Sequence, residues 1–259
     1  VVAHVDAGRL VFITGSKFFG GPPFSAALLV PPALRGRAAR LDGWPAGLAS
    51  YLSHVDVPPS LPGLRAAASR DPNPGLLLRW AAAGAEMRSF LNASPEIRDE
   101  ILRALAAGIR DILDDERDVV SIIDSPYTDI PTPDRRGLDD LPTIFTFLVH
   151  AADGRPLDLE SARHIHRLAA EDLGQDLGPD GDARSIAQQR FHLGQPVPID
   201  RGGRVVGGLR IAVGAPTLSQ IVFDHTRGAT WIERVDRELR DVRAAVRKVA
   251  LVARHLPPA

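Results

Sequence analysis

The chain has 259 residues, of which 44% are hydrophobic and 24% charged, a composition typical of globular proteins and not of disordered or collagen-like chains. Its 31 basic and 32 acidic residues leave a net charge of -1, which gives no indication of binding to nucleic acid or to an anionic membrane. The lack of cysteine excludes disulfides, thiolate metal sites and a cysteine nucleophile within this chain. No apolar run approaches the roughly 20 residues of a membrane span, so we expect a soluble, cytoplasmic protein.

The first elements predicted in chain order are a helix end and two strands. Val1–Ala7 is typical of the end of a helix. Two short apolar runs, Leu10–Thr14 and Ala26–Val30, predict strands joined by a tight loop, because the residues between them are mostly turn formers. The only methionine is Met87, so we expect that residue 1 is not a translation start and that this chain is the C-terminal portion of a longer protein.

Irregular structure and then two helices are predicted next. Residues 35–74 hold many Pro, Gly and Ser residues and little periodicity, which indicates irregular surface with short helices. Residues 75–91 predict a helix, and its apolar face comprises Leu77, Trp80, Ala81, Ala85, Met87 and Phe90. Ser94 is a typical N-cap with proline directly after it, and it begins an amphipathic helix that extends to about Leu113.

A second, smaller domain is predicted for residues 119–259, after a first domain of residues 1–118. Prolines at positions 126, 131, 133 and 142 indicate a connecting segment at its beginning. The predicted elements then follow in the order β-α-β-β-α, with strands at 144–149, 191–199 and 205–213, a hairpin turn at 201–203, and helices at 157–173 and 230–256. This order and its apolar residues predict an α+β unit.

The use of basic residues singles out the lysines. Lysine occurs only at Lys17 and Lys248, so the other 29 basic residues are arginine. A lysine that persists in such a sequence is a candidate for chemistry that a guanidinium group cannot perform, namely attack as a neutral amine.

The residues around Lys17 predict an anion site. Thr14 and Ser16 flank a glycine directly after a strand, where hydroxyl groups and backbone N–H groups can converge on a phosphate. An amine beside a phosphate site is the arrangement needed for a Schiff base with pyridoxal phosphate, an aldehyde that carries its own phosphate. A nucleotide-binding P-loop is disfavoured, because its glycine spacing and its following helix are both missing. A surface turn with a solvated lysine remains open as the alternative.

The segment Thr14–Val30 resembles the cofactor-lysine segment of fold type I pyridoxal-phosphate enzymes. It reads Thr-Gly-Ser-Lys-Phe-Phe-Gly-Gly-Pro-Pro-Phe-Ser-Ala-Ala-Leu-Leu-Val and is most similar to the class V aminotransferase and cysteine desulfurase branch. The resemblance implies that Lys17 forms the internal aldimine, that Thr14 binds the phosphate and that Gly21 belongs to the Gly-Pro turn. Ser16 stands where the branch usually has histidine; it can donate to a phosphate but cannot perform the acid–base work of an imidazole.

A second resemblance lies near the C-terminus. Residues 208–217, Gly-Leu-Arg-Ile-Ala-Val-Gly-Ala-Pro-Thr, look like the family's strand that carries the arginine for the substrate α-carboxylate. The resemblance implies this role for Arg210, and a guanidinium suits it because it offers two parallel hydrogen bonds in a fixed geometry. A surface arginine on a hairpin is the alternative reading.

Together the two resemblances imply an α/β protein of fold type I: part of a large cofactor-binding domain followed by a small α+β domain. They imply a homodimer that acts on an amino acid or related amine with pyridoxal phosphate, by aminotransferase-type chemistry. A lyase or decarboxylase on the same scaffold stays open, as does a truncated, non-catalytic binding or dimerisation module. The family's aspartate for the pyridine nitrogen and its ring-stacking aromatic residue would lie upstream of Val1. Desulfurase chemistry is disfavoured because it needs a cysteine.

Other candidate motifs are weaker. His164 and His166 are two residues apart on a predicted helix and point to different sides, so we expect no metal site there. Asp224 and His225 form an acid–base pair in sequence, but no serine lies in a nucleophile-elbow pattern, which disfavours a hydrolase triad.

Overall fold

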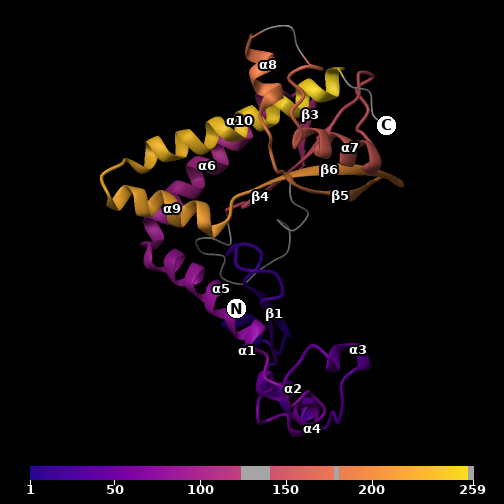
Figure 1. The fold of residues 1–259 in the computed structure, drawn as a ribbon, viewed down its shortest axis with the longest axis vertical. Helices are drawn as coiled ribbons and strands as arrows, with labels where there is room; N and C mark the ends of the chain where they lie inside the picture. Colours follow the sequence, from indigo (N-terminus) through magenta and orange to yellow (C-terminus); the bar gives the residue numbers. More distant parts are fainter. Residues whose placement is uncertain (124–140, 178–180, 256–259) are drawn as a thin grey trace. The chain divides into compact units, whose positions relative to one another are not determined.

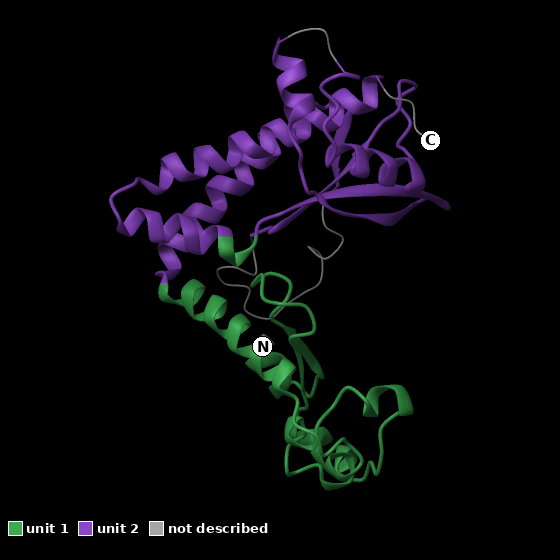
Figure 2. Cartoon of the chain, in the orientation of Figure 1, with its two compact units in different colours: residues 1–92, 214–216 green, residues 93–213, 217–259 purple. Residues whose placement is uncertain are grey.

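The computed structural model describes residues 1–123, 141–177 and 181–255, which form helices and antiparallel sheets and therefore a mixed α/β protein (Figure 1). Two compact units are present (Figure 2). The first comprises residues 1–92 and 214–216, and the second comprises residues 93–213 and 217–259. The predicted connecting segment lies largely outside the described residues.

A two-stranded antiparallel sheet forms the centre of the first unit. Helix α1 (Val2–Asp6) precedes strand β1 (Val11–Thr14), which pairs with β2 (Ala26–Leu29) from Val11 opposite Leu29 to Thr14 opposite Ala26. The predicted order of strand, loop and strand is confirmed. The loop between the strands contains Lys17.

The irregular segment of the first unit has a small core of its own. Its short helices are α2 (Pro32–Ala38), α3 (Ala46–Ala49), the 3-10 helix η1 (His54–Asp56) and α4 (Pro62–Ala66). Buried Val57, Leu64 and Ala68 form the core, and Trp44 packs against it. The Trp44 Nε1–H donates to the Leu64 carbonyl oxygen over 2.8 Å, so the indole anchors the segment. The prediction of irregular structure with short helices is confirmed.

Helix α5 (Pro74–Asn92) is present where a helix was predicted, but only part of its predicted apolar face is buried. The structure buries Ala83 and Phe90, whereas Leu77 is 70% exposed. The apolar residues of α5 itself are distributed around the whole helix, so their spacing does not determine which side packs. The packed side is selected by the loop that contains Lys17, whose glycines lie against Ala83.

Helix α6 (Pro95–Asp115) begins the second unit. The Ser94 hydroxyl accepts a hydrogen bond from the Ile97 N–H over 3.3 Å, as expected of an N-cap. The helix buries an apolar stripe that comprises Ile101, Leu102, Leu105, Ile109, Ile112 and Leu113. Since α6 packs on the C-terminal helix and on the first strand of the second sheet, it belongs to the second compact unit, which begins at Ala93.

The second unit is built on a four-stranded antiparallel sheet. Its strands, in spatial order, are β3 (Val120–Ile123), β4 (Ile144–Val149), β6 (Arg204–Ala212) and β5 (Gly194–Arg201). Its remaining helices are α7 (Leu159–Ala169), α8 (Gly181–Gln188), α9 (Ala215–Thr226) and α10 (Trp231–His255). The predicted order β-α-β-β-α omitted β3, α8 and α9.

Alternation along β6 separates its two faces. A Cβ built on Gly207 would lie 2.3 Å from the Ala162 Cβ, so Gly207 faces α7. Side chains alternate along a strand, so Arg210 points to the opposite face, where Thr146 of β4 is its register partner. The turn of the predicted hairpin is confirmed, with Gly202 and Gly203 at φ of 64° and 86°.

Candidate functional site

Backbone hydrogen bonds fold the loop around Lys17 into a compact turn. The Gly15 N–H donates to the Ser25 carbonyl over 2.8 Å and so continues the β1–β2 ladder by one residue. The Gly21 N–H returns to the Gly15 carbonyl over 2.8 Å, and the Gly20 N–H donates to the Lys17 carbonyl over 2.9 Å. The loop is therefore held by its own main chain.

Two glycines let this loop lie directly on α5. A Cβ on Gly15 would come within 2.5 Å of the Ala83 Cβ, and a Cβ on Gly21 within 2.7 Å of the same atom. Real Cβ atoms do not approach each other so closely, and Ala83 itself is fully buried. The two glycines and Ala83 thus form one close contact that fixes the base of the loop.

The two hydroxyl groups next to Lys17 lie side by side. Thr14 Oγ1 and Ser16 Oγ are 2.9 Å apart, and the Ser16 N–H donates to Thr14 Oγ1 over 3.3 Å. One hydroxyl proton is used between the two oxygens, so the other stays available to donate to a third group. Both residues are half-buried at the end of β1.

Lys17 itself is exposed, and its side chain makes no hydrogen bond or ion pair within the described part of the chain. The residues after it are anchored by aromatic contacts. The rings of Phe18, Phe19 and Phe90 meet edge to face, with centroids 5.3 to 5.9 Å apart. In addition, the Phe18 carbonyl accepts a hydrogen bond from the Ala215 N–H over 2.7 Å. Within the described residues the amine is therefore without a partner, whereas the backbone that carries it is held by several contacts.

The second lysine is in the opposite environment. Lys248 of α10 is completely buried, and its Nζ donates to the Glu171 and Gln189 carbonyls, which follow the C-terminal ends of α7 and α8. Burial lowers the pKa of this amine, and Asp172 opposes that shift. Lys248 therefore joins two helix ends, and of the two lysines only Lys17 is accessible to a ligand.

Arg210 lies in the second unit, half-buried on β6. Its Nε–H donates to the Gln195 carbonyl over 3.1 Å, while its two terminal nitrogens carry no hydrogen bond within the described residues. The position opposite Arg210 on β5 is Gly194, where a Cβ would lie 3.1 Å from the Arg210 Cβ. The side chain is thus oriented through Nε and keeps its paired nitrogens available for a carboxylate.

The predicted site residues divide between the units. Thr14, Ser16, Lys17 and Gly21 come together in one loop of the first unit, and Arg210 belongs to the second. Sequence reasoning missed Gly15 and Ala83, the contact that positions the loop. A buried alanine in a helix with apolar residues on all sides gave no signal that would identify it.

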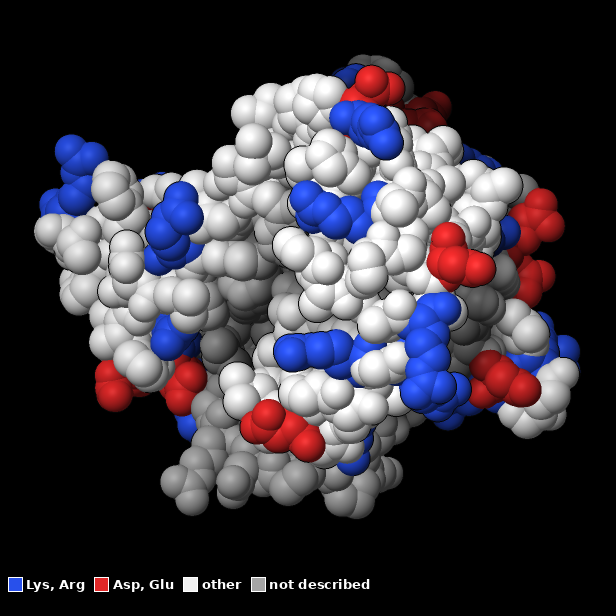
Figure 3. Space-filling view, turned by 90° about the horizontal axis from the view of Figure 1, so that it is seen from below, with Lys and Arg blue, Asp and Glu red and all other residues white. Residues whose placement is uncertain are grey.

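The charged groups of the other predicted motifs have structural partners. Asp224 pairs with Arg234 and not with His225, whose Nδ1 instead contacts the Ala229 carbonyl at 3.2 Å. Figure 3 shows blue Lys and Arg side chains separated by uncharged surface, with acidic groups near them. No cluster of three or more His, Asp or Glu side chains that could hold a metal ion exists in the described part of the chain.

Within the same described residues, no helix has the length and apolar character needed to cross a membrane. Comparisons of this chain with protein-family models, with curated proteins and with solved structures find no match in any of the three. The loop geometry and the chemistry of its side chains are therefore the basis on which a function can be proposed.

Proposed function

We propose that this chain is part of a pyridoxal-phosphate-dependent enzyme of fold type I that acts on an amino acid or related amine, with aminotransferase-type chemistry. One observation carries the proposal: the exposed amine of Lys17 follows directly after two hydroxyl groups only 2.9 Å apart, in a loop fixed by close packing on α5. This combination places two hydroxyl groups that can donate to an anion beside an amine that has no partner among the described residues.

The residues fit the cofactor in chemical type. Thr14 and Ser16 would hold the phosphate through their hydroxyl groups and the nearby backbone N–H groups, since a phosphate accepts several hydrogen bonds at once. Lys17 would supply the amine that bonds to the aldehyde carbon. When bound, pyridoxal phosphate supplies an electron sink for negative charge at the substrate Cα.

Lys17 would have a second task once a substrate amine has taken its place. Its released amine would accept and return the proton at the substrate Cα, which is general acid–base work within reach of a flexible four-carbon side chain. Arg210 would hold the substrate carboxylate through its two terminal nitrogens, because its Nε is already committed to the Gln195 carbonyl. These roles leave transamination, elimination and decarboxylation as chemical options.

A binding or dimerisation module is the second candidate, favoured by exposed apolar side chains in the first unit. Phe12 and Leu28 are register partners on one face of the β1–β2 sheet and are 78% and 45% exposed. Leu77 and Leu78 of α5 are 70% and 68% exposed. Apolar faces of this kind mark surfaces that another chain or domain covers. Both the enzyme and the module predict that this chain assembles with another chain, but only the enzyme predicts a covalently bound cofactor.

The covalent attachment is directly testable because the chain has only two lysines. The protein would be mixed with pyridoxal phosphate, reduced with borohydride, digested and analysed by mass spectrometry. We expect one modified lysine, Lys17, with buried Lys248 unmodified. The Lys17→Arg variant keeps the charge but cannot form the imine, so it should lose the modification and the yellow colour. A wild-type protein modified elsewhere, or a Lys17→Arg variant that is still labelled to the same extent, would refute the assignment.

The reaction type needs a second experiment. Recovery of the pyridoxal form from the pyridoxamine form on addition of a keto acid would identify a transaminase, whereas its absence together with substrate breakdown would identify a lyase or decarboxylase. Arg210→Lys should raise the apparent KM for carboxylated substrates by at least about tenfold, since a charge-assisted hydrogen bond contributes about 1.5–3 kcal/mol, and should leave the cofactor colour unchanged. Failure of wild-type protein to bind the cofactor would favour the module.

A further inference from the structure

A serine and a histidine of the second unit form a hydrogen-bonded pair that the proposed function does not use. Ser121 Oγ lies 2.7 Å from His150 Nε2, and His150 Nδ1 lies 3.0 Å from the Gly154 carbonyl oxygen. We propose that Ser121 and His150 form a separate reactive site, in which the Ser121 hydroxyl is a nucleophile toward small acyl esters. This inference is independent of Lys17 and of pyridoxal phosphate.

The three groups define the protonation of the imidazole. A carbonyl oxygen only accepts hydrogen bonds, so His150 must carry its hydrogen on Nδ1 and donate it to Gly154. Nε2 of the neutral ring is then an acceptor, and the Ser121 hydroxyl donates to it. A nucleophile that donates to a base, with the base oriented by a third group, is the arrangement that activates serine in acyl-transfer enzymes.

The sheet register brings the two side chains together. Ser121 lies opposite Leu148 in the β3–β4 ladder, and His150 follows two residues later, with its N–H donating to the Val119 carbonyl over 2.7 Å. Diagonal neighbours of this kind on antiparallel strands lie within reach of an aromatic side chain. Strand β3 is at the edge of the described sheet, and Ser121 is partly exposed there. A reagent in solution can therefore approach the hydroxyl.

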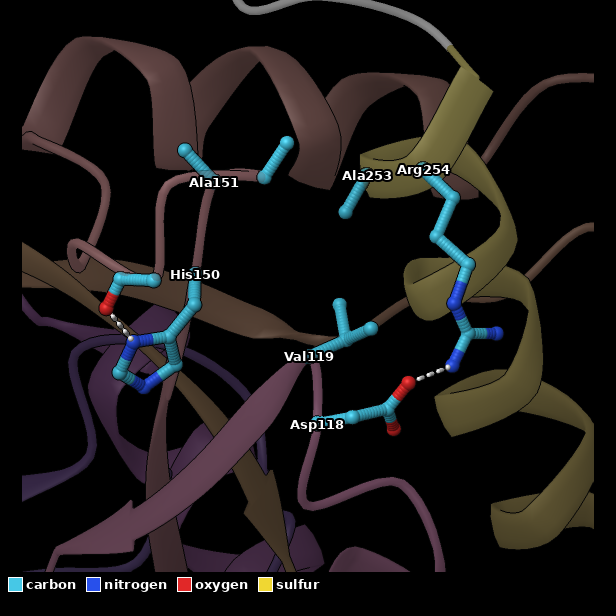
Figure 4. A pocket seen from close by; sticks show the side chains of 8 residues that line it. Asp118, Val119, His150, Ala151, Ala253 and Arg254 are labelled. Atoms are coloured by element: carbon cyan, nitrogen blue, oxygen red, sulfur yellow. Dashed lines mark hydrogen bonds and ion pairs between the residues drawn. The ribbon is translucent and has the colours of Figure 1, made fainter.

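A small pocket adjoins the histidine (Figure 4). Its volume is about 240 Å³, and both His150 and Gly154 line it. The rest of the wall is largely methyl groups, contributed by Val119, Ala151, Ala152 and Ala253.

Among the described residues, the charged groups that line this pocket are Asp118 and Arg254. They are paired over 2.8 Å, and Arg254 also donates to Glu116 over 2.9 Å. The hydrogen bond from Arg254 lowers the pKa of the Asp118 carboxyl, so this carboxylate stays ionised and paired with the guanidinium. A small cavity with a largely apolar wall, whose charged groups are engaged in ion pairs, suits an uncharged acyl group of a few carbon atoms. Small acyl esters are therefore the substrate class that the surroundings of His150 favour.

The chemistry balances with the groups present. Ser121 Oγ attacks the ester carbonyl carbon as its proton passes to His150 Nε2, and the Nδ1–H remains bonded to Gly154. Collapse of the adduct breaks the bond to the leaving alcohol, which takes the proton from Nε2, and the acyl group stays on Ser121. Water then attacks the acyl-serine with His150 again accepting a proton, which releases the acid and restores the serine.

The test uses an irreversible serine reagent, a fluorophosphonate, on the whole chain. Its good leaving group requires little stabilisation of an oxyanion, so labelling reports mainly the activation of the hydroxyl. Cleavage after Arg117 and Arg135 yields one peptide that contains both Ser121 and Ser125, and fragment masses distinguish the two. We expect stoichiometric labelling of Ser121 in the native protein and its loss in urea. A burst of nitrophenol from 4-nitrophenyl acetate, one per chain, should accompany it.

Matched variants distinguish a Ser121 hydroxyl that His150 activates from one that is only exposed to the reagent. Ser121→Ala should abolish the label, and His150→Asn should slow it at least about 100-fold, the lower range for removal of a general base. The histidine control is His225→Asn, because His225 also contacts a carbonyl through Nδ1 but has no serine partner in the described residues. The serine control is Ser50→Ala, since the Ser50 hydroxyl of wild type donates to the Gly47 carbonyl. Both controls should react like wild type.

Three results would overturn the proposal. The first is a native protein in which Ser121 remains unlabelled under conditions that label a serine esterase. The second is equal labelling of native and urea-unfolded protein, which would mean that the fold does not activate the hydroxyl. The third is a folded His150→Asn variant that reacts as fast as the His225→Asn control. The first two results depend only on the wild-type chain, so they hold even if a variant fails to fold.

Discussion

Replacing Gly15 by alanine is expected to destabilise the first unit by about 1–3 kcal/mol, the range for adding a methyl group to a packed site. The added Cβ would lie 2.5 Å from the Ala83 Cβ and 3.0 Å from Ser25 Oγ. Carbon atoms prefer a separation of about 3.5–4.0 Å, so β1 and α5 would have to move apart by roughly 1 Å or more. The loop that presents Lys17 would move with them.

A second substitution tests whether this contact is the cause. Ala83→Gly removes the opposing methyl group at a cost of about 1 kcal/mol in helix propensity, and the double variant should be more stable than the two single effects predict by at least about 1 kcal/mol. Amide hydrogen exchange of residues 11–29 and 74–92, together with urea unfolding, measures these free energies. Gly36→Ala is the control, because among the described residues nothing beyond its chain neighbours and its own helix backbone lies within 4 Å of a Cβ at that position. A neutral Gly15→Ala variant, or strictly additive effects, would refute the reasoning.

Lys248→Met should destabilise the second unit by roughly 2–4 kcal/mol, because it leaves the carbonyls of Glu171 and Gln189 at two helix ends without their donor. Burial lowers the Lys248 pKa, so the free energy of unfolding of wild type relative to this variant should be greatest above the ordinary lysine pKa. It should fall as the pH drops from that value through the lowered pKa, and urea unfolding across alkaline pH measures this change. Asp158→Ala should cost about 1 kcal/mol by removing the N-cap of α7, whereas Asp158→Asn should retain it. The hydrogen bond from the Ser161 N–H lowers the Asp158 pKa. The free energy by which wild type is more stable than the asparagine variant should therefore shrink as acid protonates the carboxylate, and an equal pH dependence of unfolding for the two proteins would contradict this.

Much of the fold could be predicted where the signal is local. The spacing of apolar residues and the Ser94 cap locate α6, and two short apolar runs around turn formers locate β1 and β2. The prediction failed where the signal is not local. Helix α5 is apolar all round, so Leu77 seemed a core residue although it is 70% exposed. Its packed side depends on glycines about sixty residues earlier in the chain, and periodicity within a helix holds no information about such a partner.

The same distinction applies to the candidate site. Thr14, Ser16 and Lys17 could be found because they are adjacent in sequence and their side-chain chemistry is evident from residue type. The pair of Ser121 and His150 could not be found, because its geometry depends on the register of two strands that are joined by a long segment. The joining of two helix ends by Lys248 was equally hidden, since an isolated lysine on a helix is far more often solvated.

The hydrogen bond between the Ala215 N–H and the Phe18 carbonyl has a consequence for folding during translation. The residue after Lys17 is tied to a residue near the far end of the chain, so the first unit is incomplete when its first 92 residues have left the ribosome. At about 5–20 residues per second, residue 215 is added roughly 10–40 s after residue 18. During that interval the lysine loop lacks the hydrogen bond from Ala215. Maturation of the loop is thus coupled to the synthesis of almost the whole chain.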